Sequence, residues 1–137
     1  MQAISQTAPL SGKAIWAGRV MSGLVILFMI FDASLKLIPL AVVTDSMIEL
    51  GYPPSAGLAR GLAIVILVCT ALYAVPRTSI LGAILLTGYM GGAIASHLRI
   101  GSPLFSHVLF GLYLGLMVWG GLWLRERNLR ALIPFWR

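Results

Sequence analysis

The sequence predicts an all-α fold, an integral membrane four-helix bundle with a short interfacial helix between the first and second spans. Of the 137 residues, 59% are hydrophobic and only 10% are charged, and the mean hydropathy is +0.95. Ordinary soluble domains have a smaller apolar share. The apolar residues gather in four runs, each long enough to cross a bilayer, for which about 20 residues suffice. Such spans use most of the chain, so we expect residues 1–137 to form a single transmembrane domain.

The four spans are predicted from the apolar runs and from the residues that end them. They cover, in order, about residues 15–38, 57–75, 80–98 and 105–124. Pro39 ends the first span, because a proline disfavours helical backbone in the residue before it. Only residues 76–79 separate the second span from the third, so these two should be antiparallel neighbours.

A short amphipathic helix is predicted between the first and second spans, over about residues 39–50. Its apolar residues recur every three or four positions, at Leu40, Val43, Met47 and Leu50. Asp45 and Glu49 lie on the opposite side. A helix of this kind is expected to lie in the membrane interface.

Lys and Arg are distributed unequally between the two ends of the predicted bundle. The end that holds both termini carries Lys13, Arg19, Arg77, Arg125, Arg127, Arg130 and Arg137. The other end carries only Lys36, Arg60 and Arg99. Because cytoplasmic loops hold the excess of Lys and Arg, we expect a multi-pass membrane protein with both termini cytoplasmic. This pattern explains the net charge of +6, and no nucleic-acid partner is expected.

Small residues recur at helical spacing in two of the spans. The third span has Gly88, Gly92 and Ser96, and the fourth has Gly111 and Gly115. Small residues let helix backbones approach closely in lipid, so both faces are expected to pack against neighbouring helices. Packing within one bundle is the simpler interpretation, and a homo-oligomer joined through these faces is the alternative.

Four ionisable residues in the outer half of the predicted bundle are candidates for catalysis. Asp32 and Lys36 are four residues apart, which places them on one face of a helix, and each is costly inside hydrocarbon. His97 ends the third span and His107 opens the fourth, at the same depth. We expect a polar pocket in which Asp32 is the acid or base, a histidine is its partner and Lys36 sets the charge. The alternative is a structural ion pair, with Lys36 reaching to the interface, beside two hydrogen-bonded interfacial histidines.

The substrate of such a pocket should be a lipophilic small molecule that enters from the bilayer. Phe28, Tyr89 and Tyr113 are the candidates for contact with it. Glu49 is a further candidate if the interfacial helix folds back over the pocket as a lid. Asp45, on the same helix face, favours simple exposure of Glu49 instead.

No cofactor or metal is expected. The single cysteine, Cys69, excludes CxxC motifs, and the sequence lacks a Gly-rich phosphate loop, a G-x-S-x-G elbow and a dinucleotide fingerprint. A haem or metal held by His97 and His107, or a bound quinone, are the alternatives.

Four segments of the sequence form a recognisable pattern: FDASLKL at 31–37, LGYPP at 50–54, LGAILLTGYMGGAIASHLRIGSPLF at 81–105 and LRALIPFWR at 129–137. This pattern resembles the bacterial DoxX-like family of small four-helix membrane proteins, and the resemblance implies a location in the bacterial inner (cytoplasmic) membrane. The wider DoxX group is described as membrane subunits of oxidoreductase systems, including quinone-linked sulfur oxidation, so the resemblance implies an oxidoreductase partner. The architecture is also similar to that of sterol isomerases and sigma-2 receptors, which hold carboxylates in a lipophilic pocket. By this analogy of fold, Asp32 matches such a carboxylate in role.

These expectations leave three functions open. The first is cofactor-free acid/base isomerisation or ring opening of a lipophilic molecule bound in the pocket. The second is a quinone-binding accessory subunit of a membrane oxidoreductase system, whose partner protein supplies the electrons. The third is a non-enzymatic membrane chaperone or assembly factor.

Overall fold

The structure is a computed structural model that describes residues 11–38 and 41–133. Within these ranges the chain forms helices and no strand, which confirms the predicted all-α fold. The elements are α1 (Gly12–Leu37), α2 (Ala41–Glu49), α3 (Ala56–Ala74), α4 (Ser79–Arg99), the π-helix η1 (Leu104–Val108), α5 (Phe110–Arg125) and α6 (Arg127–Leu132).

Four helical segments are long and apolar enough to cross a membrane, namely α1, α3, α4 and the continuous stretch of η1 and α5. Many of their large exposed side chains are apolar, among them Leu27, Phe31, Ile64 and Leu116. Because lipid is the medium that accepts such a surface, the chain is a multi-pass membrane protein in contact with lipid.

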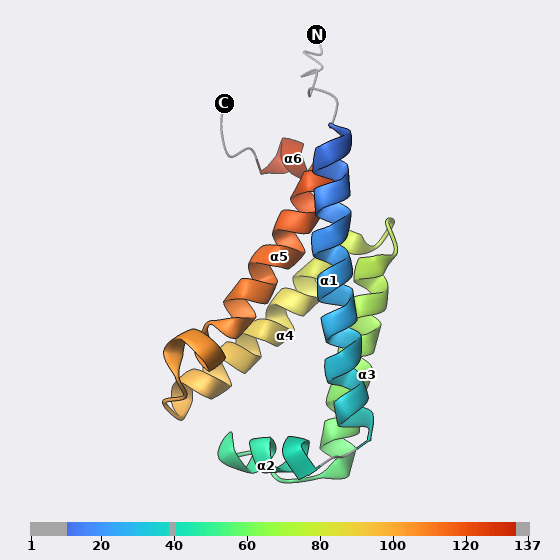
Figure 1. The fold of residues 1–137 in the computed structure, drawn as a ribbon. Coiled ribbons are helices and arrows are strands. Elements are labelled where there is room, and N and C mark those ends of the chain that lie inside the picture. Colours follow the sequence, from blue (N-terminus) through green and yellow to red (C-terminus); the bar gives the residue numbers. More distant parts are fainter. Residues whose placement is uncertain (1–10, 39–40, 134–137) are drawn as a thin grey trace.

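The four spans contact one another in a closed ring. The order is α1, α3, α4, α5, and α5 contacts α1 again. Figure 1 shows α1 and α3 running side by side, whereas α4 and α5 lean away from them toward the end where α2 lies. The start of α1 and the short helix α6 lie at the opposite end. We call these two ends the α2 end and the terminal end.

Small residues bring the helix backbones together in the terminal half. A Cβ atom added to Gly18 of α1 would lie 2.6 Å from the carbonyl oxygen of Gly121 in α5. One added to Gly82 of α4 would lie 2.2 Å from the backbone nitrogen of Tyr73 in α3. No side chain fits at either glycine, so these two helix pairs are in close backbone contact.

Tyr73 joins three helices in the same half. Its side chain is fully buried, and its hydroxyl lies 2.8 Å from the hydroxyl of Ser22 and donates to the carbonyl oxygen of Val118 at 2.8 Å. Both partners are on other helices, α1 and α5. The spans are therefore fastened together near the terminal end, and the α2 end is where they diverge.

Two glycine turns shape the α2 end. Helices α2 and α4 are each followed by a glycine in the left-handed region, Gly51 with φ 81° and Gly101 with φ 70°. In each case the amide of the next residue, Tyr52 or Ser102, donates to the carbonyl five residues earlier. This is the Schellman motif, which only glycine adopts without strain. The turns place Tyr52 and Ser102 where their side chains bond to α4.

The observed helices differ from the predicted spans by one to three residues at each end. Two features were not predicted. The fourth span begins as the π-helix η1 after Pro103, and α6 forms in the basic tail, where Arg130 donates to the carbonyl oxygens of Trp123 and Leu124 at the end of α5. Of the predicted interfacial helix, residues 39 and 40 lie outside the described residues.

Candidate functional site

Helix α1 places Asp32 and Lys36 on one face in the half of the bundle near α2. Lys36 Nζ donates to a carboxylate oxygen of Asp32, and the two groups form an ion pair. The Asp32 side chain is 29% exposed and that of Lys36 is 19% exposed. A charge held inside a span needs a partner, and the spacing of four residues along the helix provides it. The pair is thus internally neutral and partly accessible.

His97 and His107 lie against each other across the turn between α4 and η1. Their ring centroids are 5.6 Å apart and the rings meet edge to face at 62°. His97 Nδ1 is 3.1 Å from the hydroxyl of Ser102, and His107 Nδ1 is 2.8 Å from that of Ser106. Neither Nε2 atom has a hydrogen-bond partner among the described residues. Each ring is therefore oriented by a serine and keeps one nitrogen for another partner.

Both groups line one cavity of about 580 Å³. A volume of this size is typical of sites for small organic ligands. Its lining includes six of the eight predicted site residues: Phe28, Asp32, Lys36, Tyr89, His97 and His107. Most of the rest is apolar, and the rings of Phe28 and Phe110 meet edge to face within the lining, with centroids 5.2 Å apart. The arrangement is an apolar chamber with a few polar groups.

Helix α2 covers this cavity. Its apolar residues Val43 and Met47, together with Leu50, line the cavity, whereas Asp45 and Glu49 are exposed on the other side. The helix thus presents the apolar face that its sequence pattern predicts, and that face is turned to the interior of the protein.

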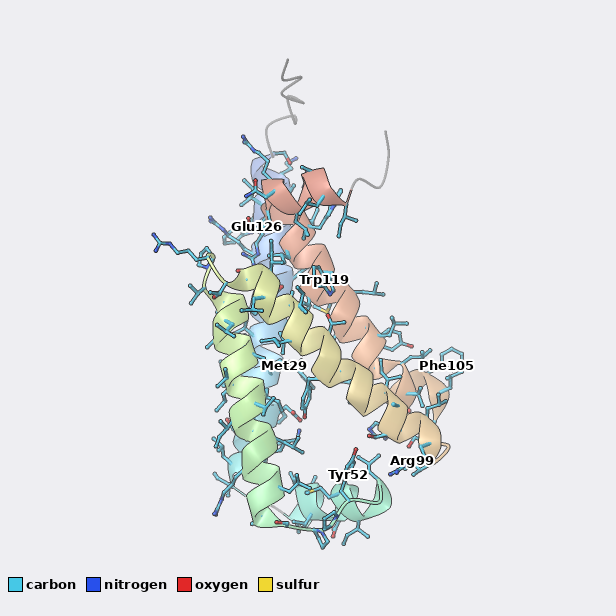
Figure 2. The ribbon with its side chains drawn as sticks, turned by 180° about the vertical axis from the view of Figure 1, so that it is seen from behind. Met29, Tyr52, Arg99, Phe105, Trp119 and Glu126 are labelled. Atoms are coloured by element: carbon cyan, nitrogen blue, oxygen red, sulfur yellow. The ribbon has the colours of Figure 1, made fainter. Side chains whose placement is uncertain are left out.

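Two polar contacts fasten the end of α2 to α4. The hydroxyl of Tyr52 lies 2.8 Å from that of Ser96. Since Ser96 donates its only hydroxyl proton to the carbonyl oxygen of Gly92, Tyr52 is the donor to Ser96. The guanidinium of Arg99 donates to the carbonyl oxygen of Leu50. The last carbonyls of a helix have no partner within the helix, so this bond satisfies one of them at the end of α2. Figure 2 shows Tyr52 and Arg99 near each other at this end of the bundle.

Two predicted site residues are not among those that line the cavity. Tyr113 is exposed on α5, and Glu49 is exposed on α2. Residues of the apolar face of α2, and not Glu49, line the cavity, so the role of Glu49 in a lid stays a prediction. The catalytic and binding roles of all eight residues stay predictions.

The small-residue face of α4 has a different role from the one predicted. A Cβ atom added to Gly88 or Gly92 would meet no other atom within 4 Å, and both glycines line the cavity. The expectation that this face packs against a neighbouring helix is therefore wrong within the chain, because α4 leans away from α1 and α3 there. On α5 the expectation is correct at Gly111, where a Cβ atom would lie 2.8 Å from the Ile94 side chain.

Sequence reasoning missed the residues that hold the site together. Tyr52, Ser96, Ser102 and Ser106 orient α2 and the two histidines. A signal for Tyr52 and Ser102 was present, because each follows a glycine that ends a helix, and the Schellman motif places the next residue against the preceding turn. For Ser96 the sequence pattern predicts helix packing, because it follows Gly88 and Gly92 at helical spacing.

The described ranges contain no group of three or more His, Cys, Asp or Glu side chains that could hold a metal ion. His97 and His107 are a pair without a third ligand of these types there, and a zinc site takes at least three protein ligands.

Comparison with protein families matches most of the chain to a family of known description. The model described as the DoxX-like family matches residues 20–121, which is 102 of the 137 residues and runs from α1 to α5. All six cavity residues that the sequence predicted fall within this stretch. No curated protein and no solved structure matches the chain.

Proposed function

The chain belongs to the DoxX-like family of membrane proteins, and we propose that this member binds a lipophilic small molecule in the cavity beneath α2 and transfers a proton on it. One observation carries the proposal: a cavity of about 580 Å³ with a mostly apolar wall gathers Asp32, Lys36, His97 and His107. Ligand sites commonly combine an apolar wall with a few polar groups that orient the ligand.

The chemistry that suits these groups is movement of a proton within the ligand. The Asp32 carboxylate takes a proton from a carbon next to a carbonyl or double bond, and the Lys36 ammonium forms an ion pair with this carboxylate. The Nε2 atom of His97 or His107 hydrogen-bonds the ligand oxygen on which charge develops. The proton is then returned to a different carbon. Such an isomerisation needs no electron donor and no cofactor.

Quinone binding is a second candidate, favoured by the separation of the polar groups between two walls. Asp32 and Lys36 belong to α1, whereas the histidines belong to α4 and η1. A quinone has a carbonyl at each end of an apolar ring, so it matches two sets of donors across an apolar chamber. Its reduction would require electrons from a partner protein.

The first experiment identifies the ligand. The full chain is purified in a mild detergent, extracted with organic solvent and analysed by mass spectrometry against a detergent blank. The proposal predicts a lipophilic compound in near-stoichiometric amount. A quinone in the extract favours the second candidate, and an extract that matches the blank contradicts both.

The second experiment tests proton transfer on the identified compound. The protein is incubated with it in deuterated water, and deuterium bound to carbon is measured by mass spectrometry. The wild-type chain should introduce deuterium and Asp32→Asn should not, because the amide cannot act as a base. Asp45→Asn is the matched control, since this carboxylate is exposed on the outer side of α2 and does not line the cavity. Equal incorporation by wild type and Asp32→Asn would exclude Asp32 as the base.

A further inference from the structure

A second cavity, of about 260 Å³, lies at the terminal end of the bundle. It is formed by α1 and by the ends of α3 and α5, and its charged lining residues are Arg19 and Arg125. Among the residues that the structure describes, no acidic side chain lines this cavity. Because α3 ends at Ala74 and α5 at Arg125, the cavity lies where the spans leave the hydrocarbon core, at the level of the lipid headgroups.

Arg125 is a largely buried cation, and its one ion pair among the described residues, with Glu126, is long. Its side chain is 14% exposed, and its Nε donates to the hydroxyl of Ser22 at 3.3 Å. The guanidinium lies 5.6 Å from the ring centroid of Tyr73, and the nearest carboxylate oxygen, on Glu126, is 4.0 Å from its NH1 atom. An anion in the cavity would supply the stronger hydrogen bonds that a guanidinium forms with a charged acceptor.

Arg19 adds a second cation to the same cavity. It is exposed, and it makes no hydrogen bond or ion pair within residues 11–38 and 41–133. Its guanidinium is therefore available to an anion that lies between it and Arg125. Two arginines facing one small cavity at headgroup level are typical of sites for anionic lipid headgroups.

The cavity continues toward the membrane interior along α1. Gly23 and Ile26 follow Arg19 by four and seven residues, so the three lie on one face of the helix, and all line the cavity. A Cβ atom added to Gly23 would meet no other atom within 4 Å. The site is thus cationic at its outer end and open and apolar at its inner end.

We propose that this cavity binds an anionic phospholipid. The phosphate lies between Arg19 and Arg125, and the first part of an acyl chain runs over Gly23 toward Ile26. A free phosphate would use the arginines alone, whereas a lipid uses the charged and the apolar parts together. This site is separate from the cavity beneath α2, and its occupancy is independent of the function proposed there.

The proposal is tested by lipid binding to the full chain in a non-ionic detergent, measured by native mass spectrometry. Phosphatidylglycerol should bind, and phosphatidylcholine, whose headgroup has no net charge, should bind at least about tenfold more weakly. Arg19→Gln should weaken phosphatidylglycerol binding by about tenfold. Because Arg19 is exposed, this change leaves the fold intact. Arg127→Gln is the control, since Arg127 is exposed near the same end but does not line the cavity.

A second pair of variants distinguishes a lipid from a free anion. Gly23→Leu fills the apolar part, and Gly61→Leu places the same side chain on an exposed, open position of α3. Gly23→Leu should weaken phosphatidylglycerol binding and Gly61→Leu should not. Equal losses of phosphatidylglycerol binding in Arg19→Gln and Arg127→Gln would mean that the lipid is attracted by the positive charge of this end as a whole. This result would overturn the proposal of a site in the cavity. If Gly23→Leu had no effect and inorganic phosphate at millimolar concentration fully displaced phosphatidylglycerol, the occupant would be a free anion. This result would overturn the lipid as the occupant.

Discussion

The hydroxyl of Tyr52 lies 2.8 Å from the hydroxyl of Ser96, and this bond joins the turn after α2 to the end of α4. Together with the bond from Arg99 to the Leu50 carbonyl oxygen, it holds α2 across the cavity. The other described attachment of α2 is its apolar face, which lines the cavity. We therefore expect α2 to open more readily than the spans do.

Tyr52→Phe tests this attachment. The change removes one hydrogen bond worth about 0.5–1.5 kcal/mol, so the amides of α2 should exchange with deuterium roughly two to ten times faster, measured by mass spectrometry of the exchanged peptides. The amides of α3 should be unaffected. Tyr113→Phe is the control, because Tyr113 is exposed on α5 and makes no hydrogen bond through its hydroxyl among the described residues. Unchanged exchange of α2 in Tyr52→Phe would show that the bond does not hold the helix.

The ion pair of Asp32 and Lys36 should show a strong coupling in a double-mutant cycle. Asp32→Asn leaves the Lys36 charge without its partner in a part-buried position, which should cost about 1–3 kcal/mol of unfolding free energy. Adding Lys36→Met should recover most of this loss, because the lone charge is gone. Unfolding in mixed micelles of increasing denaturing detergent provides the measurement. If the losses of unfolding free energy in Asp32→Asn and in Lys36→Met simply added up in the double variant, the two side chains would not be coupled.

The two kinds of glycine in α4 should respond in opposite ways to alanine. Gly82→Ala places a methyl group 2.2 Å from the backbone nitrogen of Tyr73, and the strain should destabilise the chain by about 1–3 kcal/mol or more. Gly88→Ala meets open space, and the better helix propensity of alanine should stabilise the chain by up to about 1 kcal/mol. Thermal unfolding in detergent compares the two. A loss of stability of similar size in both variants would argue against an open cavity at Gly88.

The orientation in the membrane is tested by reporter fusions. A reporter after Arg137 should read cytoplasmic, and one inserted at Gly101 should read the opposite side, because the terminal end holds the excess of Lys and Arg. Because one span separates Gly101 from Arg137, the two reporters must lie on opposite sides of the membrane. A C-terminal reporter on the outer side would reverse the predicted topology and would place the cavity beneath α2 on the cytoplasmic side.

The helices were predictable from the sequence because lipid imposes a simple rule on apolar length. The pairing of Asp32 with Lys36 follows from helical spacing alone, and the nearness of His97 and His107 follows from the short connection between their spans. Such relationships are local in the chain, so a pattern of residues is enough to find them.

Relationships between distant segments were not predictable. Whether Gly92 faces another helix or a cavity depends on how far α4 leans from α1 (Figure 1), which the spacing of residues along α4 does not determine. The bond between Tyr52 and Ser96 joins residues that are 44 positions apart. The spacing of residues along one helix does not predict these features, because they depend on how the helices pack against one another.

Whether the cavity beneath α2 holds a lipophilic ligand can be tested by placing a large side chain in this cavity. Gly92 lines the cavity and Gly91 does not, and a Cβ atom added to either meets no other atom within 4 Å. The amount of ligand extracted from purified Gly92→Leu and Gly91→Leu is compared with that from the wild-type chain. Gly92→Leu should lose most of the ligand, whereas Gly91→Leu should retain it. Full retention by Gly92→Leu would contradict the account, because the ligand would then lie elsewhere on the protein.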